Sequence, residues 1–244
     1  ALIHQSGGGT GFSFSRLRPK GDRVRESGGV ASGPVSFIRV FDTATEVIKQ
    51  GGRRRGANMA VLSVSHPDVL EFVHAKHDPT QFLNFNFSVS APDAFLTAVD
   101  RDEAWPLVNP RNGAVAREVR ARELWEAIAA SAWRTGDPGV LFADAIERGN
   151  PTPELGRLEA TNPCGEQPLL PYEACTLGSI NLARLVGSET LNWERLDELV
   201  RLGVRFLDNV IEASRYPLPE IEREVRGNRK IGLGVMGVAE ALIQ

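Results

Sequence analysis

The sequence predicts an α/β fold with mainly parallel strands. Short apolar or alternating segments recur along the 244 residues, and amphipathic segments with helical spacing lie between them. The hydrophobic fraction of 42% and the charged fraction of 24% are those of a globular chain that buries a core without disulfides or a metal. We find no repeat of fixed period and no linker, so we expect one domain over residues 1–244.

The predicted elements follow one another in chain order. A glycine-rich turn leads into an alternating strand at 12–18, and Val40 to Ile48 have helical spacing behind a possible cap at Asp42. The later predicted elements are a buried strand at 60–64, a helix opened by His66-Pro67, a strand at 84–90, a helix after Pro92, a helix at 123–135 closed by Gly136, and a helix at 191–214. The last helix has an apolar stripe made of Leu196, Leu199, Val200, Phe206, Leu207 and Val210.

Charge and cysteine content limit the classes of protein. The net charge of −3 gives no overall attraction to nucleic acid or membrane, and the main local basic cluster is Arg53–Arg55. No apolar run approaches the roughly 18 residues of a membrane span, so we expect a cytoplasmic protein that binds neither membrane nor DNA. The chain begins at Ala1 rather than Met and stops at Gln244 within a predicted helix, so we expect a fragment truncated at both ends.

The segment 161–182 contains the most chemically suggestive residues. Prolines and a glycine surround Cys164, so the thiol is expected on a constrained loop between the amide of Asn162 and the carboxylate of Glu166. A neighbouring carboxylate raises a thiol pKa, which disfavours a thiolate nucleophile and favours chemistry in which the thiol loses a hydrogen atom. Two alternatives stay open: Cys164 is a small buried hydrophobic residue, or it forms a structural disulfide with Cys175.

Five sequence blocks, in order along the chain, resemble the catalytic subunits of ribonucleotide reductases. The segment Asn162–Leu169 with its continuation Cys175–Leu182 is similar to the active-site loop of the cobalamin-dependent class. The other four blocks are Ser6–Ser15, Ser27–Pro34, Arg54–Met59 and Arg229–Gly237. Blocks spread over nearly the whole chain in the family's order are difficult to obtain by chance.

The resemblance implies a fold and an activity. The fold implied is a ten-stranded α/β barrel made of two antiparallel halves, of which this chain supplies roughly the first half with a central cysteine-bearing finger loop. The implied activity is reduction of ribonucleotides to 2′-deoxyribonucleotides by a thiyl-radical mechanism, for DNA synthesis and repair. Adenosylcobalamin in the full-length protein is the implied cofactor, and deoxynucleotides are the implied allosteric effectors.

The resemblance also implies roles for single residues. Cys164 is similar to the cysteine that becomes the thiyl radical, Glu166 to the general base for the 3′ hydroxyl, and Asn162 to the amide that binds the sugar hydroxyls. Cys175 is similar to one member of a redox-active disulfide whose partner lies upstream, outside this chain. The residues similar to substrate-binding positions are Phe14, Ser15, Pro163 and Gly165.

Two loops resemble the effector and specificity loops of the family. Their residues are Arg25, Ser27, Gly28 and Gly29 in one loop, and Arg53, Arg54, Arg55, Gly56, Ala57 and Asn58 in the other. The implied partners are a ribonucleoside di- or triphosphate, a deoxynucleotide, a reductant of the thioredoxin or glutaredoxin type, and a second copy of the full-length chain.

Two other readings of the whole chain remain open. The chain is also similar to class I large subunits, which need a separate radical-generating subunit. Assignment to class I is therefore the alternative within the enzyme class. A noncatalytic nucleotide-binding module is the alternative of another class, although the presence of Asn162, Cys164, Glu166 and Cys175 together disfavours it.

Two local patterns are given a structural interpretation. Gly232–Gly237 satisfies the dinucleotide-binding pattern G-x-G-x-x-G, but no buried strand is predicted before it. His74 and His77 lie at i and i+3 with Asp78 adjacent, and we interpret them as an exposed polar face with no metal.

Overall fold

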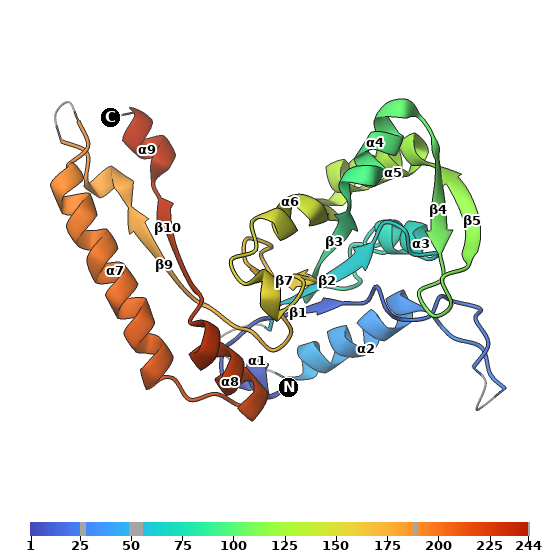
Figure 1. Ribbon diagram of the computed structural model, residues 1–244, viewed down its shortest axis with the longest axis horizontal. Coiled ribbons are helices and arrows are strands. Elements are labelled where there is room, and N and C mark those ends of the chain that lie inside the picture. Colours follow the sequence, from blue (N-terminus) through green and yellow to red (C-terminus); the bar gives the residue numbers. More distant parts are fainter. Residues whose placement is uncertain (25–27, 49–55, 188–189, 244) are drawn as a thin grey trace. The chain divides into compact units, whose positions relative to one another are not determined.

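The computed structural model describes residues 1–24, 28–48, 56–187 and 190–243 (Figure 1). The chain divides into two compact units, Ala1–Pro171 and Tyr172–Gln244. Each unit is described by itself below. The prediction of one domain over residues 1–244 stays a prediction.

The first unit is built on a parallel sheet of four strands. Their order in the sheet is β1 (Thr10–Ser13), β2 (Asn58–Ser63), β3 (Phe85–Ala91) and β6 (Gly139–Phe142). Every pairing in this sheet is parallel, and Asn58 of β2 stands opposite both Thr10 of β1 and Phe85 of β3. The predicted α/β class with parallel strands is confirmed.

Helices and two small hairpins complete the first unit (Figure 1). The helices are α1 (Leu2–Gln5), α2 (Pro34–Val47), α3 (Val69–His74), α4 (Asp93–Arg101), α5 (Ala121–Thr135), α6 (Ala143–Arg148) and the 3-10 turn η1 (Pro153–Leu155). The antiparallel hairpins are β4 (Ala104–Val108) with β5 (Val115–Arg120), and β7 (Ala160–Thr161) with β8 (Pro168–Leu169). The predicted helix at 123–135 is thus confirmed, and it ends at Gly136 as expected.

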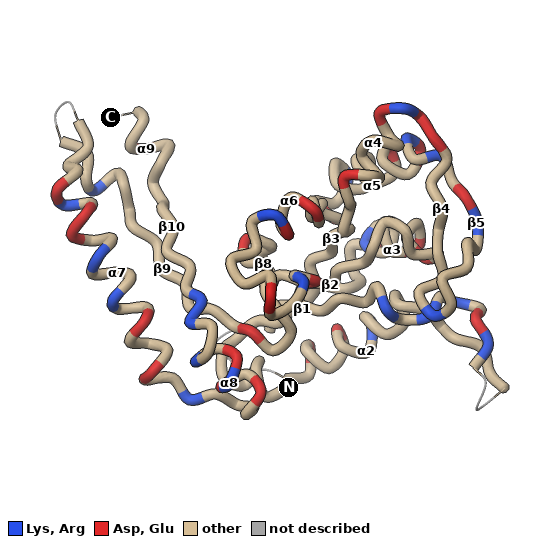
Figure 2. Tube along the Cα trace, in the orientation of Figure 1, with Lys and Arg blue, Asp and Glu red and all other residues tan. Residues whose placement is uncertain are grey.

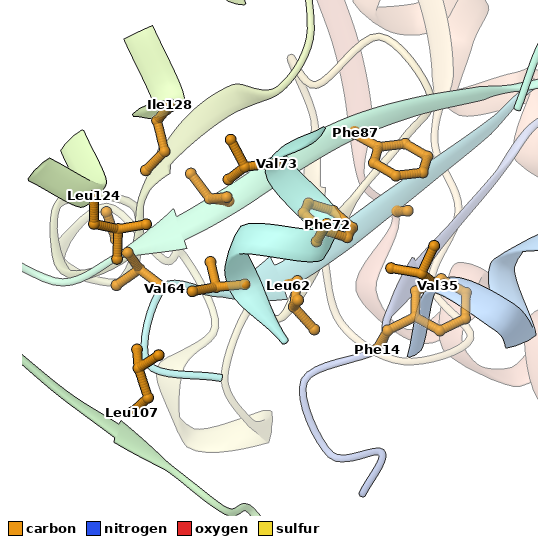
Figure 3. Close-up of a cluster of buried hydrophobic side chains, with 14 of the residues drawn as sticks. Phe14, Val35, Leu62, Val64, Phe72, Val73, Phe87, Leu107, Leu124 and Ile128 are labelled. Atoms are coloured by element: carbon orange, nitrogen blue, oxygen red, sulfur yellow. The ribbon is translucent and has the colours of Figure 1, made fainter. Parts of the chain in front are cut away.

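The core of the first unit lies between the central strands and α3 and α5 (Figure 3). Leu62 is fully buried, and the rings of Phe72 and Phe87 stack with centroids 4.6 Å apart. Burying aromatic side chains of this size contributes strongly to stability, and the stacked geometry adds about 0.5–1.5 kcal/mol. The parallel sheet of the first unit is therefore rigid.

Helix α2 differs from the sequence prediction. It begins at Pro34, whose fixed φ and missing N–H suit the first turn of a helix, rather than behind Asp42. Asp42 lies inside the helix, and its carboxylate accepts the backbone N–H of Asn84 at 3.0 Å. The expected cap was wrong because a tertiary partner uses this carboxylate.

The second unit pairs strands β9 (Thr176–Asn181) and β10 (Ile231–Met236) in parallel. Its helices are η2 (Leu182–Arg184), α7 (Trp193–Ala213), α8 (Pro219–Asn228) and α9 (Val238–Ile243). The glycine-rich pattern at 232–237 is largely the strand β10 itself, so it does not form the loop that the dinucleotide pattern requires.

The apolar stripe predicted for α7 is only partly buried. Leu207 is 4% exposed, whereas Val200 and Phe206 are 40% and 64% exposed. Acidic and basic residues are spaced along the same helix (Figure 2). A two-stranded sheet covers only a narrow part of a helix. The buried part of the α7 apolar stripe is therefore narrower than the predicted stripe.

Candidate active site

Cys164 lies in a tight loop at the end of the β7–β8 hairpin, and residues 162–167 are called the cysteine loop below. Asn162 closes this loop through three hydrogen bonds. Its N–H donates to the Gln167 carbonyl at 3.2 Å, its Oδ1 accepts the Gln167 N–H at 3.0 Å, and its carbonyl accepts the Gly165 N–H at 3.1 Å. The side chain of Asn162 therefore shapes the loop that carries the thiol.

Gly165 has a φ of +88°, which a residue with a Cβ rarely adopts. This left-handed residue separates Cys164 from Glu166 and turns the chain back toward β8. A side chain at this position would be strained, although the nearest atom to an added Cβ, Cε of Met59, is 3.7 Å away. The loop therefore needs glycine for its backbone conformation rather than for space.

The hairpin is held against the amino-terminal ends of the sheet strands. Asn86, the second residue of β3, donates from Nδ2 to the Pro163 carbonyl at 2.7 Å. Gly9 and Gly11 leave room for this approach, because an added Cβ would overlap the Pro163 ring or the Thr161 carbonyl, respectively. Thr161 is consequently only 3% exposed.

The thiol of Cys164 and the side chain of Glu166 are both exposed. The alternative in which Cys164 is a buried hydrophobic residue is therefore wrong. Cys164 and Cys175 are both thiols and are not joined in a disulfide. The cysteine loop can thus present a thiol, a carboxylate and an amide to one molecule.

Cys175 belongs to the second unit. It is half-buried and immediately precedes Thr176, the first residue of β9. Thr176 pairs with Ile231 at the start of β10. The predicted redox cysteine therefore lies where the chain enters a parallel pair of strands.

The residues predicted to contact an effector lie partly outside the described residues. Arg25, Ser27, Arg53, Arg54 and Arg55 are among those that are not described.

Gly28 and Gly29 belong to the first of the two predicted effector loops, where the Val24 N–H donates to the Gly29 carbonyl at 2.9 Å. At the base of this loop, Arg111 forms an ion pair with Asp22 at 2.9 Å. Hydrogen bonds from Arg111 and Asn109 hold the pKa of the Asp22 carboxyl below its usual value.

Gly56 and Asn58 of the second effector loop are buried, and Ala57 is exposed. The Asn58 amide accepts a hydrogen bond from Thr10 at 2.5 Å and donates to Thr45 at 3.0 Å. It therefore joins β1, β2 and α2, and its side chain supports the loop rather than projecting from it.

Phe14 and Ser15 follow β1. The Phe14 ring is 4% exposed and belongs to the core. The hydroxyl of Ser15 accepts the Ser63 N–H at 2.8 Å. The side chains of Phe14 and Ser15 are thus both engaged within the first unit.

No group of three or more His, Cys, Asp or Glu side chains within the described residues could hold a metal ion. The rings of His74 and His77 are 4.8 Å apart, and His77 Nε2 lies 2.9 Å from the Ser131 hydroxyl. Of the helices in the described part of the chain, none is both long and apolar enough to cross a membrane.

Asn86 is a supporting residue that the sequence analysis did not identify. Its position between Phe85 and Phe87 was a usable signal, because alternation along a strand places a polar residue on the face opposite two buried rings. Its partner Pro163 lies 77 residues away in sequence, so the contact itself could not be predicted.

The fold and the loop together define a class: α/β proteins that present a cysteine on a rigid hairpin against a parallel sheet. A family model described as "Ribonucleotide reductase, barrel domain" matches residues 1–244. The chain belongs to this family.

Three relatives illustrate the similarity. A vitamin B12-dependent ribonucleoside-diphosphate reductase of Mycobacterium tuberculosis is 57% identical over 243 residues, which are 99% of this chain and 35% of the relative. A protein of the same name from Thermoplasma acidophilum is 54% identical over 246 residues, covering 100% of this chain and 32% of the relative. A putative ribonucleoside-diphosphate reductase large subunit of Frog virus 3 is 39% identical over 242 residues, covering 91% and 41%. The chain therefore spans less than half the length of these relatives.

Proposed function

We propose that the full-length protein reduces ribonucleoside diphosphates to 2′-deoxyribonucleoside diphosphates by a thiyl-radical reaction, for DNA synthesis and repair. The observation that carries this proposal is the cysteine loop, which presents the exposed Cys164 thiol and the Glu166 carboxylate on either side of Gly165. The names of the mycobacterial and archaeal relatives favour a diphosphate substrate over a triphosphate.

The proposed roles follow from the chemistry of the three side chains. The Cys164 thiol loses a hydrogen atom, and the resulting thiyl radical takes the 3′ hydrogen of the ribose, re-forming the S–H bond. Glu166 takes the proton of the 3′ hydroxyl. Because Asn162 Oδ1 accepts the Gln167 N–H, we assign its NH₂ group to a sugar hydroxyl. A thiol that loses a hydrogen atom is not hindered by a neighbouring carboxylate.

We propose adenosylcobalamin as the cofactor of the full-length protein. When bound, it supplies the radical that removes the hydrogen atom from a thiol. Cys164 fits this requirement because its thiol is exposed at the tip of a loop, where a bulky group can approach it. The loop also holds the thiol in a fixed place through Asn162 and Asn86. Such fixed geometry is what hydrogen-atom transfer needs.

Cys175 is proposed as one half of the redox pair that supplies the electrons. Two thiols become a disulfide, losing two electrons and two protons, while the 2′ hydroxyl of the substrate leaves as water. The partner cysteine is expected upstream, in the part of the protein outside this chain. A thioredoxin- or glutaredoxin-type dithiol then reduces the disulfide, which fits a cytoplasmic location.

Allosteric control and dimer formation are also proposed. The loops near residues 22–31 and 53–58 are proposed to bind a deoxynucleotide effector. Helix α2 exposes Phe37, Val40 and Val47 at 48%, 65% and 75%. An exposed apolar helix face of this kind suits a contact with a second copy of the full-length chain. Sedimentation of the full-length protein with and without a deoxynucleotide tests this association.

The central experiment measures deoxynucleotide formation by the full-length protein with adenosylcobalamin, a ribonucleoside diphosphate and a dithiol reductant. We expect turnover without any second subunit. Cys164→Ser and Glu166→Gln should each lower turnover by at least about 100-fold, because each removes a reacting group. Glu154→Gln, which alters an exposed carboxylate of η1, is the matched control and should leave turnover unchanged.

Each alternative has its own outcome in this experiment. Activity that strictly requires a separate radical-generating subunit would support the class I assignment and overturn the cofactor proposal. Deoxynucleotide binding with no turnover under any condition would support a noncatalytic nucleotide-binding module. Substantial turnover by Cys164→Ser would overturn the radical assignment of that residue.

A further inference from the structure

The second unit contains a buried ion pair between Glu173 and Lys230. Lys230 Nζ lies 2.7 Å from Glu173 Oε2, and the two side chains are 10% and 0% exposed, respectively. Asn228 donates from Nδ2 to the other carboxylate oxygen of Glu173 at 2.7 Å. Both carboxylate oxygens therefore have a polar partner, which a buried carboxylate requires.

This pair differs from the ion pairs on the surface of the same unit. Arg201 and Asp197 of α7, for example, are 78% and 61% exposed. Acidic and basic residues are spread along α7 (Figure 2). Burying two charges is costly, and a well-packed apolar pair of the same volume is often at least as stable. Stability alone is thus a weak explanation for Glu173 and Lys230.

The position of the pair suggests another explanation. Lys230 immediately precedes Ile231, the first residue of β10, and Ile231 pairs with Thr176 at the start of β9. Glu173 lies three residues before Thr176, and Cys175 lies between them. The ion pair therefore joins the two segments that enter the sheet, and on one of them it lies two residues before Cys175.

The turn between α8 and β10, which carries Lys230, is itself held in place. Arg229 ends α8 in the left-handed conformation with a φ of +51°. Its guanidinium donates to Asp208 at 2.8 Å and to Glu212 at 2.5 Å, both on α7. The turn between α8 and β10 is thus attached to α7 through Arg229 and to the Cys175 segment through Lys230.

We infer that Glu173, Lys230 and Asn228 are positioning residues that hold the Cys175 segment in place for disulfide formation. This inference rests on the proposed redox role of Cys175. A disulfide forms only when the two Cα atoms lie within about 4.4–6.8 Å of each other, so a small displacement of one segment prevents closure. The ion pair limits such displacement at the residue two positions before the thiol.

The test uses the full-length holoenzyme with adenosylcobalamin, reduced beforehand and then freed of external reductant. One measurement is the rate at which a ribonucleoside diphosphate is converted in a single turnover, with the accompanying loss of Cys175 thiol followed by mass spectrometry. A second is the rate of Cys175 alkylation by iodoacetamide. A third is the change in the cofactor's visible spectrum on mixing, which follows chemistry at Cys164.

We expect Glu173→Gln and Lys230→Met to slow single-turnover disulfide formation by about tenfold or more, since a misplacement of about 1 Å can have an effect of this size. The Cys175 alkylation rate should change, while the spectral change stays the same. Lys230→Arg keeps the charge and should restore most of the rate. Asp197→Asn, which breaks an exposed pair on α7, is the matched control and should behave like the unmodified enzyme.

A single variant that leaves an unpaired buried charge can fail to fold. The double variant Glu173→Gln/Lys230→Met removes both charges and then decides the question. Slow disulfide formation in the folded double variant supports the inference. Unmodified rates of disulfide formation and alkylation in the double variant, or in either folded single variant, overturn it.

Cys175→Ser, measured in parallel, separates this inference from the proposed function. Continued multiple turnover by Cys175→Ser would contradict the redox role of Cys175. It would therefore also contradict the positioning inference. Loss of turnover by Cys175→Ser together with full activity of the Glu173 and Lys230 variants would overturn only the positioning inference.

Discussion

Asn86 on strand β3 donates a hydrogen bond from Nδ2 to the carbonyl oxygen of Pro163, the residue before Cys164, at 2.7 Å. The bond connects the cysteine loop directly to the parallel sheet. Since β3 is an inner strand that pairs with β2 on one side and β6 on the other, its position is strongly determined. The place of the thiol therefore depends on one side chain of the sheet as well as on the loop's own hydrogen bonds.

Replacing Asn86 tests this dependence. In the full-length enzyme, Asn86→Ala should lower kcat about two- to tenfold with little change in KM, because a lost hydrogen bond contributes about 0.5–1.5 kcal/mol. Asn86→Asp should lower kcat further, since a carboxylate would repel the Pro163 carbonyl. Asn209→Ala on α7 is the control and should keep full activity. Equal kcat values for Asn86→Ala and the unmodified enzyme would contradict this dependence.

The close approach of β1 to the hairpin leads to a second prediction. An added Cβ at Gly11 would overlap the backbone carbonyl of Thr161, which cannot rotate away. Gly11→Ala should therefore lower the free energy of unfolding by about 1–3 kcal/mol and reduce turnover as the hairpin shifts. Urea denaturation and steady-state kinetics of the full-length enzyme measure the two effects.

The matched control is Gly234→Ala in β10. No atom would lie within 4 Å of the added Cβ there, so neither stability nor turnover should fall by a comparable amount. A Gly11→Ala enzyme that matches Gly234→Ala in both measurements would show that the hairpin does not need this approach.

The sequence was sufficient to predict elements whose local pattern and tertiary role agree. The run that became β2 is mainly buried and apolar, the run that became β3 has buried apolar residues alternating with polar ones, and α5 has a clear apolar face and a glycine at its end. Strand β5 was missed because most of its residues are exposed and half of them are charged. Strand β10 was missed because its glycines resemble a loop.

The residues of the cysteine loop were predictable from a resemblance, but the residues that support them were not. Cys164, Glu166 and Asn162 lie within a stretch of five residues, so one motif contains them. Asn86 and Pro163 are 77 residues apart, and their contact exists only after the sheet and the hairpin have formed. Asp42 shows the opposite case. Local rules favour it as a helix cap, but its carboxylate instead accepts the backbone N–H of Asn84.

Burial of His66 predicts a dependence of stability on pH. Its Nε2 lies 2.9 Å from the Leu17 carbonyl, its Nδ1 accepts the Asp68 N–H at 3.1 Å, and burial lowers its pKa below the usual 6.5. Below pH 6.5 the unfolded chain gains a proton that the folded chain does not. The contribution of His66 to stability is therefore complete above about pH 6.5 and is lost as the pH falls toward its folded pKa.

Urea denaturation of the full-length protein between about pH 5 and 8 measures this dependence. The free energy of unfolding should fall by up to about 1.4 kcal/mol for each unit by which the pH is lowered, because one proton binds to the unfolded chain but not to the folded chain. His66→Gln, which cannot titrate, should flatten this slope while also lowering stability at pH 7. His4 also has a lowered pKa, so some slope should remain. A slope unchanged by His66→Gln would mean that other groups cause it.

The last prediction concerns the base of the proposed effector loop. Arg111 donates from Nε and Nη2 to the two carboxylate oxygens of Asp22, at 2.9 and 3.1 Å. Asp22 also accepts the Ala31 N–H at its carbonyl, at 2.8 Å, so it fixes both arms of the loop. Such a two-point contact is specific to arginine, and lysine does not reproduce it.

In the full-length enzyme, Arg111→Ala should raise the deoxynucleotide concentration needed for half-maximal stimulation by about fivefold, the size of a modest allosteric coupling. Turnover without effector should stay the same, because the cysteine loop is untouched. Arg111→Lys should resemble Arg111→Ala, and Arg101→Ala, at an exposed position of α4, should leave the response unchanged. If Arg111→Ala lowers effector-free turnover and effector response equally, Asp22 and Arg111 support the fold in general. If the effector response of Arg111→Ala is identical to that of the unmodified enzyme, this loop does not take part in allosteric control.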